Sequence, residues 1–157
     1  MAVVDILNDQ DEMRAHCYEF VMWPRRWREY SDICPLDWQL CRLIYQERPK
    51  IPGEPGIYTL LIQPGIANHS MCSYLMYVGQ TNSLRRRFGD YLNREKLETG
   101  RPKVFRLLNK YPDHTWFCFS LVPEAYLDSV ESALLIAYMP PANDHLPAEV
   151  SRIRGAF

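Results

Sequence analysis

The stretch "YVGQTNSLRRRFGDYL" (residues 77–92) contains the end of one predicted element and the whole of another. Its first residues close a segment rich in aromatic and β-branched side chains, which is typical of a strand. After a polar turn, Leu84, Phe88 and Leu92 recur at helical spacing, and Asn82 or Ser83 is positioned to act as the N-cap. The stretch therefore predicts a strand that leads directly into an amphipathic helix.

The segments on either side of this stretch complete a small sheet with helices. Residues 56–62 (GIYTLLI) and 73–79 (SYLMYVG) predict a hairpin, and residues 115–122 (TWFCFSLV) predict a third strand. Three helices are predicted around these strands, at residues 83–97, 104–111 and 125–139. This order predicts an α+β fold, in which a small, mainly antiparallel three-stranded sheet is flanked by helices.

The first fifty residues have a different character. Apolar residues at helical spacing in segments 13–23 (MRAHCYEFVMW) and 36–45 (LDWQLCRLIY) predict helices, which prolines interrupt. Residues 48–56 are rich in proline and glycine and predict a turn into a new unit. We therefore expect a helical N-terminal extension over residues 1–50 and a second domain over residues 51–157.

The composition limits the class of protein. With 47% hydrophobic and 24% charged residues, the chain is expected to be globular, and none of its apolar runs is long enough to cross a bilayer. The first residues are acidic where a secretory signal would be basic. Five scattered cysteines without a CxxC pair argue against a disulfide framework or a thiolate zinc site. We expect a cytoplasmic protein with no membrane partner.

Basic residues are concentrated in one part of the chain. Residues 80–110 include nine basic and three acidic side chains, whereas the whole chain has a net charge of −1. Such an asymmetry is typical of a phosphate-binding surface. A solvated helical surface has the same charge pattern, so charge alone leaves both interpretations open.

Helical geometry separates the three consecutive arginines, because each residue turns by ~100° around the axis. Arg86 falls opposite the apolar face and is expected in water, while Arg85 falls on one shoulder of that face. Arg87 falls on the other shoulder, one turn before Tyr91. A guanidinium held rigidly at this rim is suited to gripping a phosphate. The alternative is that Arg87 extends along the core or pairs with an acid.

Glu131 occupies an unusual position in the last predicted helix. On a helical projection it falls inside the apolar arc that includes Leu127 and Leu134, whereas Asp128 falls on the polar side. A carboxylate in such a position is costly unless a cation or hydrogen-bond donors meet it. Glu131 is therefore either one half of an ion pair or a functional group, as a metal ligand or a catalytic acid.

Five elements in a fixed order resemble the GIY-YIG nuclease superfamily. They are the tripeptides at residues 56–58 (GIY) and 77–79 (YVG), followed by Arg87, Glu131 and Asn143. The resemblance covers about residues 54–145, and the step from Glu131 to Asn143 is most similar to the excision-repair branch of the family. The overall size also suits a small restriction-type or defence nuclease. The resemblance implies cleavage of phosphodiester bonds with one divalent cation, Mg²⁺ or Mn²⁺.

The resemblance gives roles to three tyrosines. Tyr58 and Tyr77 match the two motif tyrosines, and Tyr58 is expected to orient or deprotonate the attacking water. Tyr91, where some members have histidine, or Tyr77 would relay a proton. Without the resemblance, Tyr58 and Tyr77 would be interpreted as ordinary strand packing.

Three further positions complete the implied site. Arg87 matches the phosphate-binding arginine, Glu131 the metal-binding glutamate, and Asn143 the asparagine that closes the site. Two features depart from the family pattern. The motif tyrosines are separated by 18 residues, which implies an enlarged hairpin loop, and Gln80 replaces a lysine found in some members.

DNA is the expected substrate and partner. The expected nucleic-acid contacts are Arg85, Arg87, Arg94, Lys96, Arg101 and Lys103. In the N-terminal extension, tryptophans interleaved with arginines would either stack on bases or pack against the core or a dimer interface. A homodimer or a complex with a partner protein would form through this extension.

The sequence thus predicts a metal-dependent DNA endonuclease, either of the restriction type or with a role in phage defence or mobile elements. One alternative is a structure-specific or single-strand repair nuclease, which Tyr91 favours. Another is a nucleic-acid-binding module that has lost catalysis, although Glu131 and Arg87 are both present.

Overall fold

A four-stranded antiparallel sheet lies at the centre of the fold, with strand order β1-β4-β2-β3. The strands are β1 (Gln39–Arg42), β2 (Gly56–Ile62), β3 (Tyr74–Thr81) and β4 (Thr115–Leu121). The computed structural model describes residues 3–155, and of residues 3–7 and Arg94 the backbone alone. Strands β2 and β4 are central, so β1 and β3 form the two edges of the sheet.

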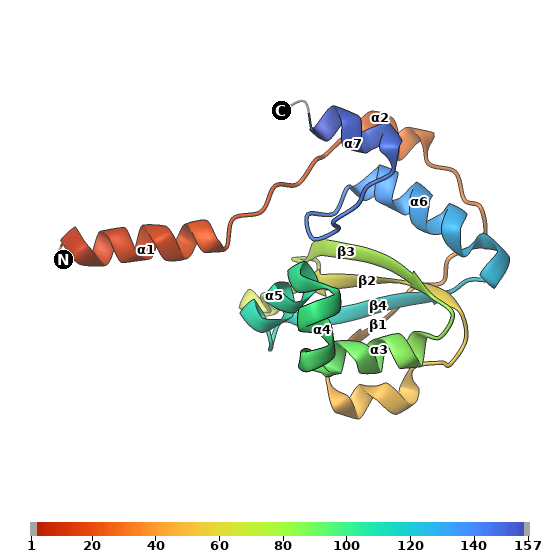
Figure 1. Ribbon diagram of the computed structural model, residues 1–157, viewed down its shortest axis with the longest axis horizontal. Coiled ribbons are helices and arrows are strands. Elements are labelled where there is room, and N and C mark those ends of the chain that lie inside the picture. Colours follow the sequence, from red (N-terminus) through yellow and green to blue (C-terminus); the bar gives the residue numbers. More distant parts are fainter. Residues whose placement is uncertain (1–2, 156–157) are drawn as a thin grey trace.

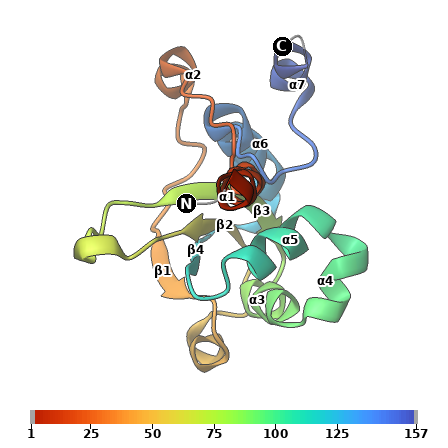
Figure 2. The same cartoon turned by 90° about the vertical axis from the view of Figure 1, so that its left-hand side faces the viewer.

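Helices cover both faces of this sheet (Figures 1 and 2). On one face lie α3 (Leu84–Leu92), α4 (Arg94–Gly100) and α5 (Pro102–Lys110), and on the other lies α6 (Leu127–Tyr138). The remaining helices are α1 (Val3–Ala15), α2 (Pro24–Glu29) and α7 (Ala148–Arg154), with short 3-10 turns η1 (Tyr45–Lys50), η2 (Ile66–Asn68) and η3 (Glu124–Tyr126). None of the described helices combines the length and hydropathy needed to span a membrane.

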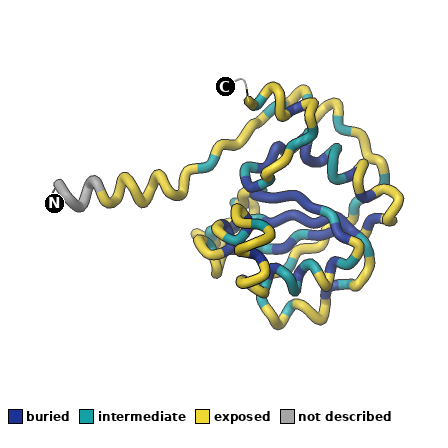
Figure 3. The backbone as a smooth tube through the Cα atoms, in the orientation of Figure 1, coloured by how far each residue is buried: buried dark blue, intermediate teal, exposed yellow. Residues whose placement is uncertain are grey.

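Alternation along the central strands divides the core in two. Tyr58 and Leu60 of β2 pack in the cluster that includes the apolar side of α3. Ile57 of β2 and Val78 of β3 pack instead against α6. Figure 3 shows the resulting pattern, with buried central strands and exposed residues 8–15 in the N-terminal helix. The two faces of β3 therefore meet different helices.

Local sequence signals set the ends of the helices around the sheet. Ser83 Oγ accepts a hydrogen bond from the backbone of Arg86 and caps α3, as the sequence predicts. Asn93 ends α3 and caps α4, so the single helix predicted over residues 83–97 is two helices. After α6, Met139 adopts a left-handed conformation (φ 45°) and two prolines prevent continuation.

The α+β class is confirmed, but the prediction of a three-stranded sheet is wrong, because the sheet has four strands. The additional strand, β1, comes from segment 36–45, for which the sequence predicts a helix. Its residues pair with β4, where Leu40 lies opposite Cys118 and Cys41 opposite Phe117. Pairing satisfies the free edge of β4, and this tertiary gain overrides the helical spacing.

Segment 13–23 also differs from the expected helix. Helix α1 ends at Ala15, and residues 17–23 are not helical. Pro24 restricts Trp23 to an extended conformation (φ −113°, ψ 92°), which stops a helix from running through this point. The N-terminal extension is therefore not wholly helical. The division into residues 1–50 and 51–157 stays a prediction, and the sheet takes one strand from the first of these ranges.

Candidate active site

Two tyrosines from neighbouring strands and one from α3 form a cluster on the α3 face of the sheet. The centre of the Tyr58 ring lies 6.1 Å from that of Tyr77 and 5.7 Å from that of Tyr91. The hydroxyl groups of Tyr58 and Tyr91 form a hydrogen bond of 2.7 Å. Tyr58 and Tyr91 are fully buried, whereas Tyr77 is 9% exposed. Tyr77 is therefore the outermost phenol of the cluster.

Burial controls the protonation of the two inner tyrosines. Loss of hydration raises the pKa of Tyr58 well above its usual value, and the neighbouring Tyr91 and Tyr77 raise it further. The positive charges of Arg87 and Arg101 oppose this rise. Burial also raises the pKa of Tyr91. Both inner side chains are therefore neutral phenols at neutral pH.

Gly79 makes room for the Tyr58 hydroxyl group. In the antiparallel register Tyr58 lies directly opposite Gly79, and opposed side chains project on the same face. A Cβ atom on Gly79 would lie 2.4 Å from Tyr58 Oη and 2.8 Å from the Tyr77 ring, too close for any side chain. The glycine of the YVG tripeptide therefore permits the two tyrosines to pack over β3.

Arg101 contacts the outermost tyrosine. It precedes Pro102, the first residue of α5, and its half-buried guanidinium donates a hydrogen bond to Tyr77 Oη. The guanidinium carbon lies 5.9 Å from the centre of the Tyr77 ring, within the range of a cation–π contact. Because arginine can only donate, the Tyr77 oxygen is fixed as an acceptor.

Glu131 and Asp128 lie one turn apart on α6 and share a donor from β3. The side-chain amide of Gln80 donates to Glu131 Oε2 (3.0 Å) and to Asp128 Oδ1 (2.5 Å). Burial raises the pKa of Glu131, the Gln80 hydrogen bonds lower it, and the nearby Asp128 raises it again. Glu131 is therefore a half-buried carboxylate that an additional cation would stabilise.

Arg101 connects the tyrosine cluster with this carboxylate. Its charge lowers the pKa of Tyr58 and Tyr91, which lie on the α3 face of the sheet, and also that of Glu131 on α6. Strand β3 is an edge of the sheet, and α3 and α6 cover its opposite faces (Figure 1). The phenols and the carboxylate therefore surround one edge strand, within electrostatic range of the same guanidinium.

Arg87 is half-buried on α3 and lies one turn before Tyr91, as the helical projection predicts. Its Nε atom is buried, and no described group forms a hydrogen bond with it. A buried donor without an acceptor is costly, and a phosphate oxygen is a strong acceptor for a guanidinium. By contrast, the side chain of Arg86 is exposed, in agreement with the sequence.

Asn143 pairs with the free edge of β3. Its side-chain oxygen accepts from the backbone nitrogen of Val78 (3.0 Å), and its side-chain nitrogen donates to the carbonyl of Val78 (2.8 Å). The adjacent Ala142 donates to the carbonyl of Met76 (2.9 Å). The segment after α6 is thus fastened along β3, and Asn143 acts by positioning the backbone between Tyr77 and Gly79.

Most of the basic residues expected to contact nucleic acid have protein partners. Arg85 Nε donates to the carbonyl of Ile51 (2.7 Å). Lys96 pairs with Asp90 (2.6 Å) and Lys103 pairs with Asp144 (3.0 Å). The side chain of Arg94 lies outside the described part of the chain. Of this expected set, Arg87 and Arg101 are the ones that the structure brings to the tyrosine cluster.

Three features of the site were missed at the sequence level. Gln80 was noted only as a replacement for lysine, although it holds both carboxylates of α6. Asp128 was placed on the polar face without a role. The sequence predicts Arg101 as a nucleic-acid contact and gives no sign that its guanidinium donates to Tyr77. The Gln80 and Asp128 contact follows from β3 packing on α6, but no sequence signal predicts the contact of Arg101.

The carboxylates fit a divalent cation that has few protein ligands. Within residues 3–155, no three His, Cys, Asp or Glu side chains gather into a chelating group. Mg²⁺ keeps several of its waters and is often bound through one or two carboxylates together with substrate phosphates. Glu131, with Asp128 one turn away, supplies that kind of partial ligand set.

Comparison with known proteins gives matches only among solved structures: no protein-family model and no curated protein matches the chain. The structures are of the GIY-YIG N-terminal endonuclease domain of UvrC from Thermotoga maritima. One, a point mutant bound to its catalytic divalent cation, is 22% identical, with a TM-score of 0.44 over 64% of this chain and 93% of that one.

Two further structures of the same domain give similar values. The domain bound to magnesium is 23% identical, with a TM-score of 0.43 over 62% of this chain and 92% of that one. Another point mutant is 24% identical, with a TM-score of 0.44 over 65% of this chain and 99% of that one. Similarity at this level assigns no function to this chain, so the function rests on its own side chains.

Proposed function

We propose that this protein is a metal-dependent endonuclease that hydrolyses DNA phosphodiester bonds by a one-metal mechanism. The observation that supports this most is that Tyr77 accepts a hydrogen bond from Arg101, while Gln80 of the same strand holds the carboxylate of Glu131. Hydrolysis of a phosphodiester needs a phosphate-binding cation, a proton acceptor and a metal ligand within one site. Arg87, Tyr77 and Glu131 would supply these three functions around β3.

Glu131 would hold Mg²⁺ or Mn²⁺, with Gln80 fixing the orientation of the carboxylate. A bound divalent cation supplies charge neutralisation on the phosphate and polarises the attacking water. Arg87 would bind a non-bridging oxygen of the scissile phosphate through the Nε that lacks a described partner. The phosphate would then lie between α3 and α6 at the edge of β3.

Tyr77 is better suited than Tyr58 to accept a proton from the attacking water. Tyr58 is fully buried, its hydroxyl group is bonded to Tyr91, and burial raises its pKa. Tyr77 lies nearer the solvent, and the hydrogen bond from Arg101 would stabilise the phenolate form that Tyr77 needs in order to take a proton from water. We therefore assign proton acceptance to Tyr77 and a packing and orienting role to the Tyr58–Tyr91 pair, which differs from the sequence expectation for Tyr58.

The biological role that we propose is restriction or phage defence, or a function in a mobile element. The alternatives are a structure-specific or single-strand repair nuclease and a non-catalytic nucleic-acid-binding module. Tyr91, buried against Tyr58, favours the repair alternative because the repair branch of the family has tyrosine at the matching position. The form of the DNA that is cut distinguishes these roles.

A cleavage assay tests the proposal. The protein is incubated with supercoiled plasmid and with single-stranded DNA, in Mg²⁺ or in EDTA, beside Glu131→Ala, Arg87→Ala and the control Arg86→Ala. We expect Mg²⁺-dependent cleavage that falls by about 10²-fold or more in the first two variants, because each removes charge stabilisation of the transition state. Arg86→Ala should cut like the wild type, since its side chain is exposed on the opposite side of α3.

The outcomes separate the three roles. Discrete plasmid fragments support a restriction-type enzyme, and preferred cleavage of single strands or junctions supports the repair alternative. Binding without cleavage supports a non-catalytic module. Unchanged cutting by folded Glu131→Ala, with circular dichroism as the check on folding, would overturn the metal role of Glu131.

A further inference from the structure

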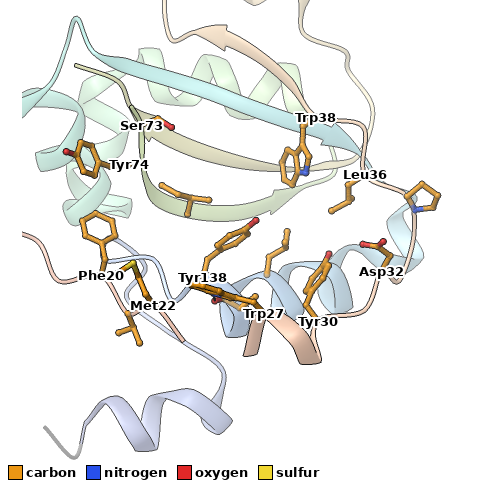
Figure 4. A pocket seen from close by; sticks show the side chains of 15 residues that line it. Phe20, Met22, Trp27, Tyr30, Asp32, Leu36, Trp38, Ser73, Tyr74 and Tyr138 are labelled. Atoms are coloured by element: carbon orange, nitrogen blue, oxygen red, sulfur yellow. Dashed lines mark hydrogen bonds between the residues drawn. The ribbon is translucent and has the colours of Figure 1, made fainter. Parts of the chain in front are cut away.

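An open groove lined by aromatic side chains has none of the three clustered tyrosines among its lining residues. It has a volume of about 1040 Å³ and runs between the N-terminal segment 20–38, the start of β3 and the C-terminal half of α6 (Figure 4). Five of its six aromatic lining residues are between 38% and 47% exposed, namely Phe20, Trp27, Trp38, Tyr74 and Tyr138, and the sixth, Tyr30, is less exposed. A contiguous exposed apolar surface of this kind marks a binding site.

The lining chemistry favours a protein segment over nucleic acid. Of the residues that line the groove, Asp32 is the one that carries a charge. A nucleic-acid strand needs cations along its phosphates, and the groove walls supply none. Side chains from an apolar helix face would instead fill the space between Trp38 and Tyr138 (Figure 4).

Residues 8–15 of helix α1 are exposed to solvent. The helix projects away from the sheet in Figure 1, and Figure 2 views it along its axis. An isolated helix of 13 residues is marginal in water, and α1 also contains poor helix formers such as Asn8 and Asp9.

Two contacts hold the C-terminal end of α1 against the end of α5. His16 Nδ1 lies 2.8 Å from Tyr111 Oη, and Lys110 Nζ donates to the carbonyl of Ala15. Phe20, only a few residues further on, already lines the groove. Return of α1 into the groove of its own chain would break these contacts, whereas the groove of another molecule leaves them intact.

Charge complementarity indicates which surface α1 fits. Helix α1 contains four acidic residues and one basic residue. Helix α2 contributes Trp27 to the groove and contains three arginines against one glutamate. Of these, Arg25 and Arg28 are exposed, and Arg25 pairs with Glu29 at 3.4 Å. An acidic helix that lies along α2 where Trp27 enters the groove would therefore meet these two arginines, which we call the rim.

We propose that two copies of this chain exchange their N-terminal helices, each inserting α1 into the aromatic groove of the other. The exchange makes two identical contacts, so it closes as a two-fold dimer and leaves no unsatisfied groove. This inference does not depend on the nuclease activity.

The oligomeric state under charge reversal tests the proposal on the full-length chain. Sedimentation equilibrium over a range of concentrations should give a dimer for the wild type. Helix variant Asp9→Lys/Glu12→Lys and rim variant Arg25→Glu/Arg28→Glu should each weaken the dimer at least about tenfold, because like charges would then face each other. Control variant Asp113→Lys/Glu124→Lys changes two exposed acids outside the groove and should stay dimeric.

Mixing the variants gives the decisive readout. The helix variant and the rim variant are each self-repelling but complementary to one another, so an equimolar mixture should form a heterodimer of near wild-type affinity. A wild type that is monomeric at every concentration overturns the proposal. So does a dimer that survives the helix variant, or a mixture that stays monomeric, since either result would mean that α1 does not occupy the groove. Thermal unfolding of each variant excludes misfolding as the cause.

Discussion

The edge of β3 and the N-terminal segment differ in how far their side chains are partnered within one chain. Around β3, phenols, amides and carboxylates are partnered within one chain: Tyr58 with Tyr91, Gln80 with Glu131, and Asn143 with Val78. In the segment before β1, Phe20 and Trp27 stay nearly half exposed. The first region holds its polar groups in place within one chain, and we propose that it binds a small, charged ligand, whereas the second would be covered by another surface.

The largest expected effect concerns the different roles that we propose for Tyr77 and Tyr58. Tyr77→Phe should lower the cleavage rate by about 10²-fold or more, because a general base is lost. Tyr58→Phe removes an inner, neutral phenol and should cost markedly less. Steady-state cleavage rates of the two variants measure the difference, and a greater loss in Tyr58→Phe would return the role of base to that residue.

A second substitution tests how tightly the β3 edge is packed. Gly79→Ala should destabilise the fold by about 1–3 kcal/mol, since the new methyl group would collide with Tyr58 Oη. Gly53→Ala is the matched control, because nothing lies within 4 Å of its Cβ position. Urea unfolding of both variants gives the comparison. Equal stability would show that the tyrosine cluster is looser than described.

The pH dependence of unfolding addresses the buried tyrosines. Burial raises the pKa of Tyr58 and Tyr91 in the folded state, whereas both ionise near pH ~10 in the unfolded chain. The folded state therefore keeps protons that the unfolded state loses, so stability is retained below pH ~10 and falls above it. The loss amounts to about 1.4 kcal/mol per pH unit for each phenol.

Tyrosine-to-phenylalanine substitutions identify the side chains that cause the loss of stability at alkaline pH. Tyr58→Phe and Tyr91→Phe should each flatten the fall of unfolding free energy above pH ~10, while Tyr126→Phe, which removes an exposed phenol, should leave the slope of the wild type. Denaturant unfolding at several alkaline pH values measures it. A slope that neither inner substitution changes would contradict the buried, neutral state of the pair.

The smallest effect is expected in the second region. Trp27→Phe keeps an aromatic ring on the groove but removes the indole donor to the carbonyl of Ala137 (3.1 Å). We expect a loss of about 0.5–1.5 kcal/mol in unfolding free energy and no change in cleavage rate. A large loss of activity would instead connect the groove with the catalytic region.

The sequence predicts the site best where local geometry determines it. Arg87 follows from its angle on α3, and Glu131 from its position inside the apolar arc of α6; both side chains are half-buried in the structure. The strands containing Tyr58 and Tyr77 follow from their composition and from the turns that bound them. The spacing of the tyrosines could not reveal which of them is buried, because that depends on how α3 packs.

Features that depend on contacts between distant segments were not predictable. Arg101 meets Tyr77 only because α4 and α5 fold back over the sheet, so helical spacing gives no hint of the contact. Strand β1 exists because β4 offers it a free edge, although Leu40 and Leu43 are spaced as in a helix. Both cases show tertiary pairing prevailing over local preference.

The position of the divalent cation relative to the phenols is the most direct test of this account. Crystals of the protein with Mn²⁺ and an uncleavable phosphorothioate DNA would locate the ion by its anomalous scattering. The account predicts one Mn²⁺ on the carboxylate of Glu131, the scissile phosphate bound to Arg87, and a water between the ion and Tyr77. Bound DNA with the ion elsewhere, and Glu131 directed away from both Arg87 and Tyr77, would contradict it.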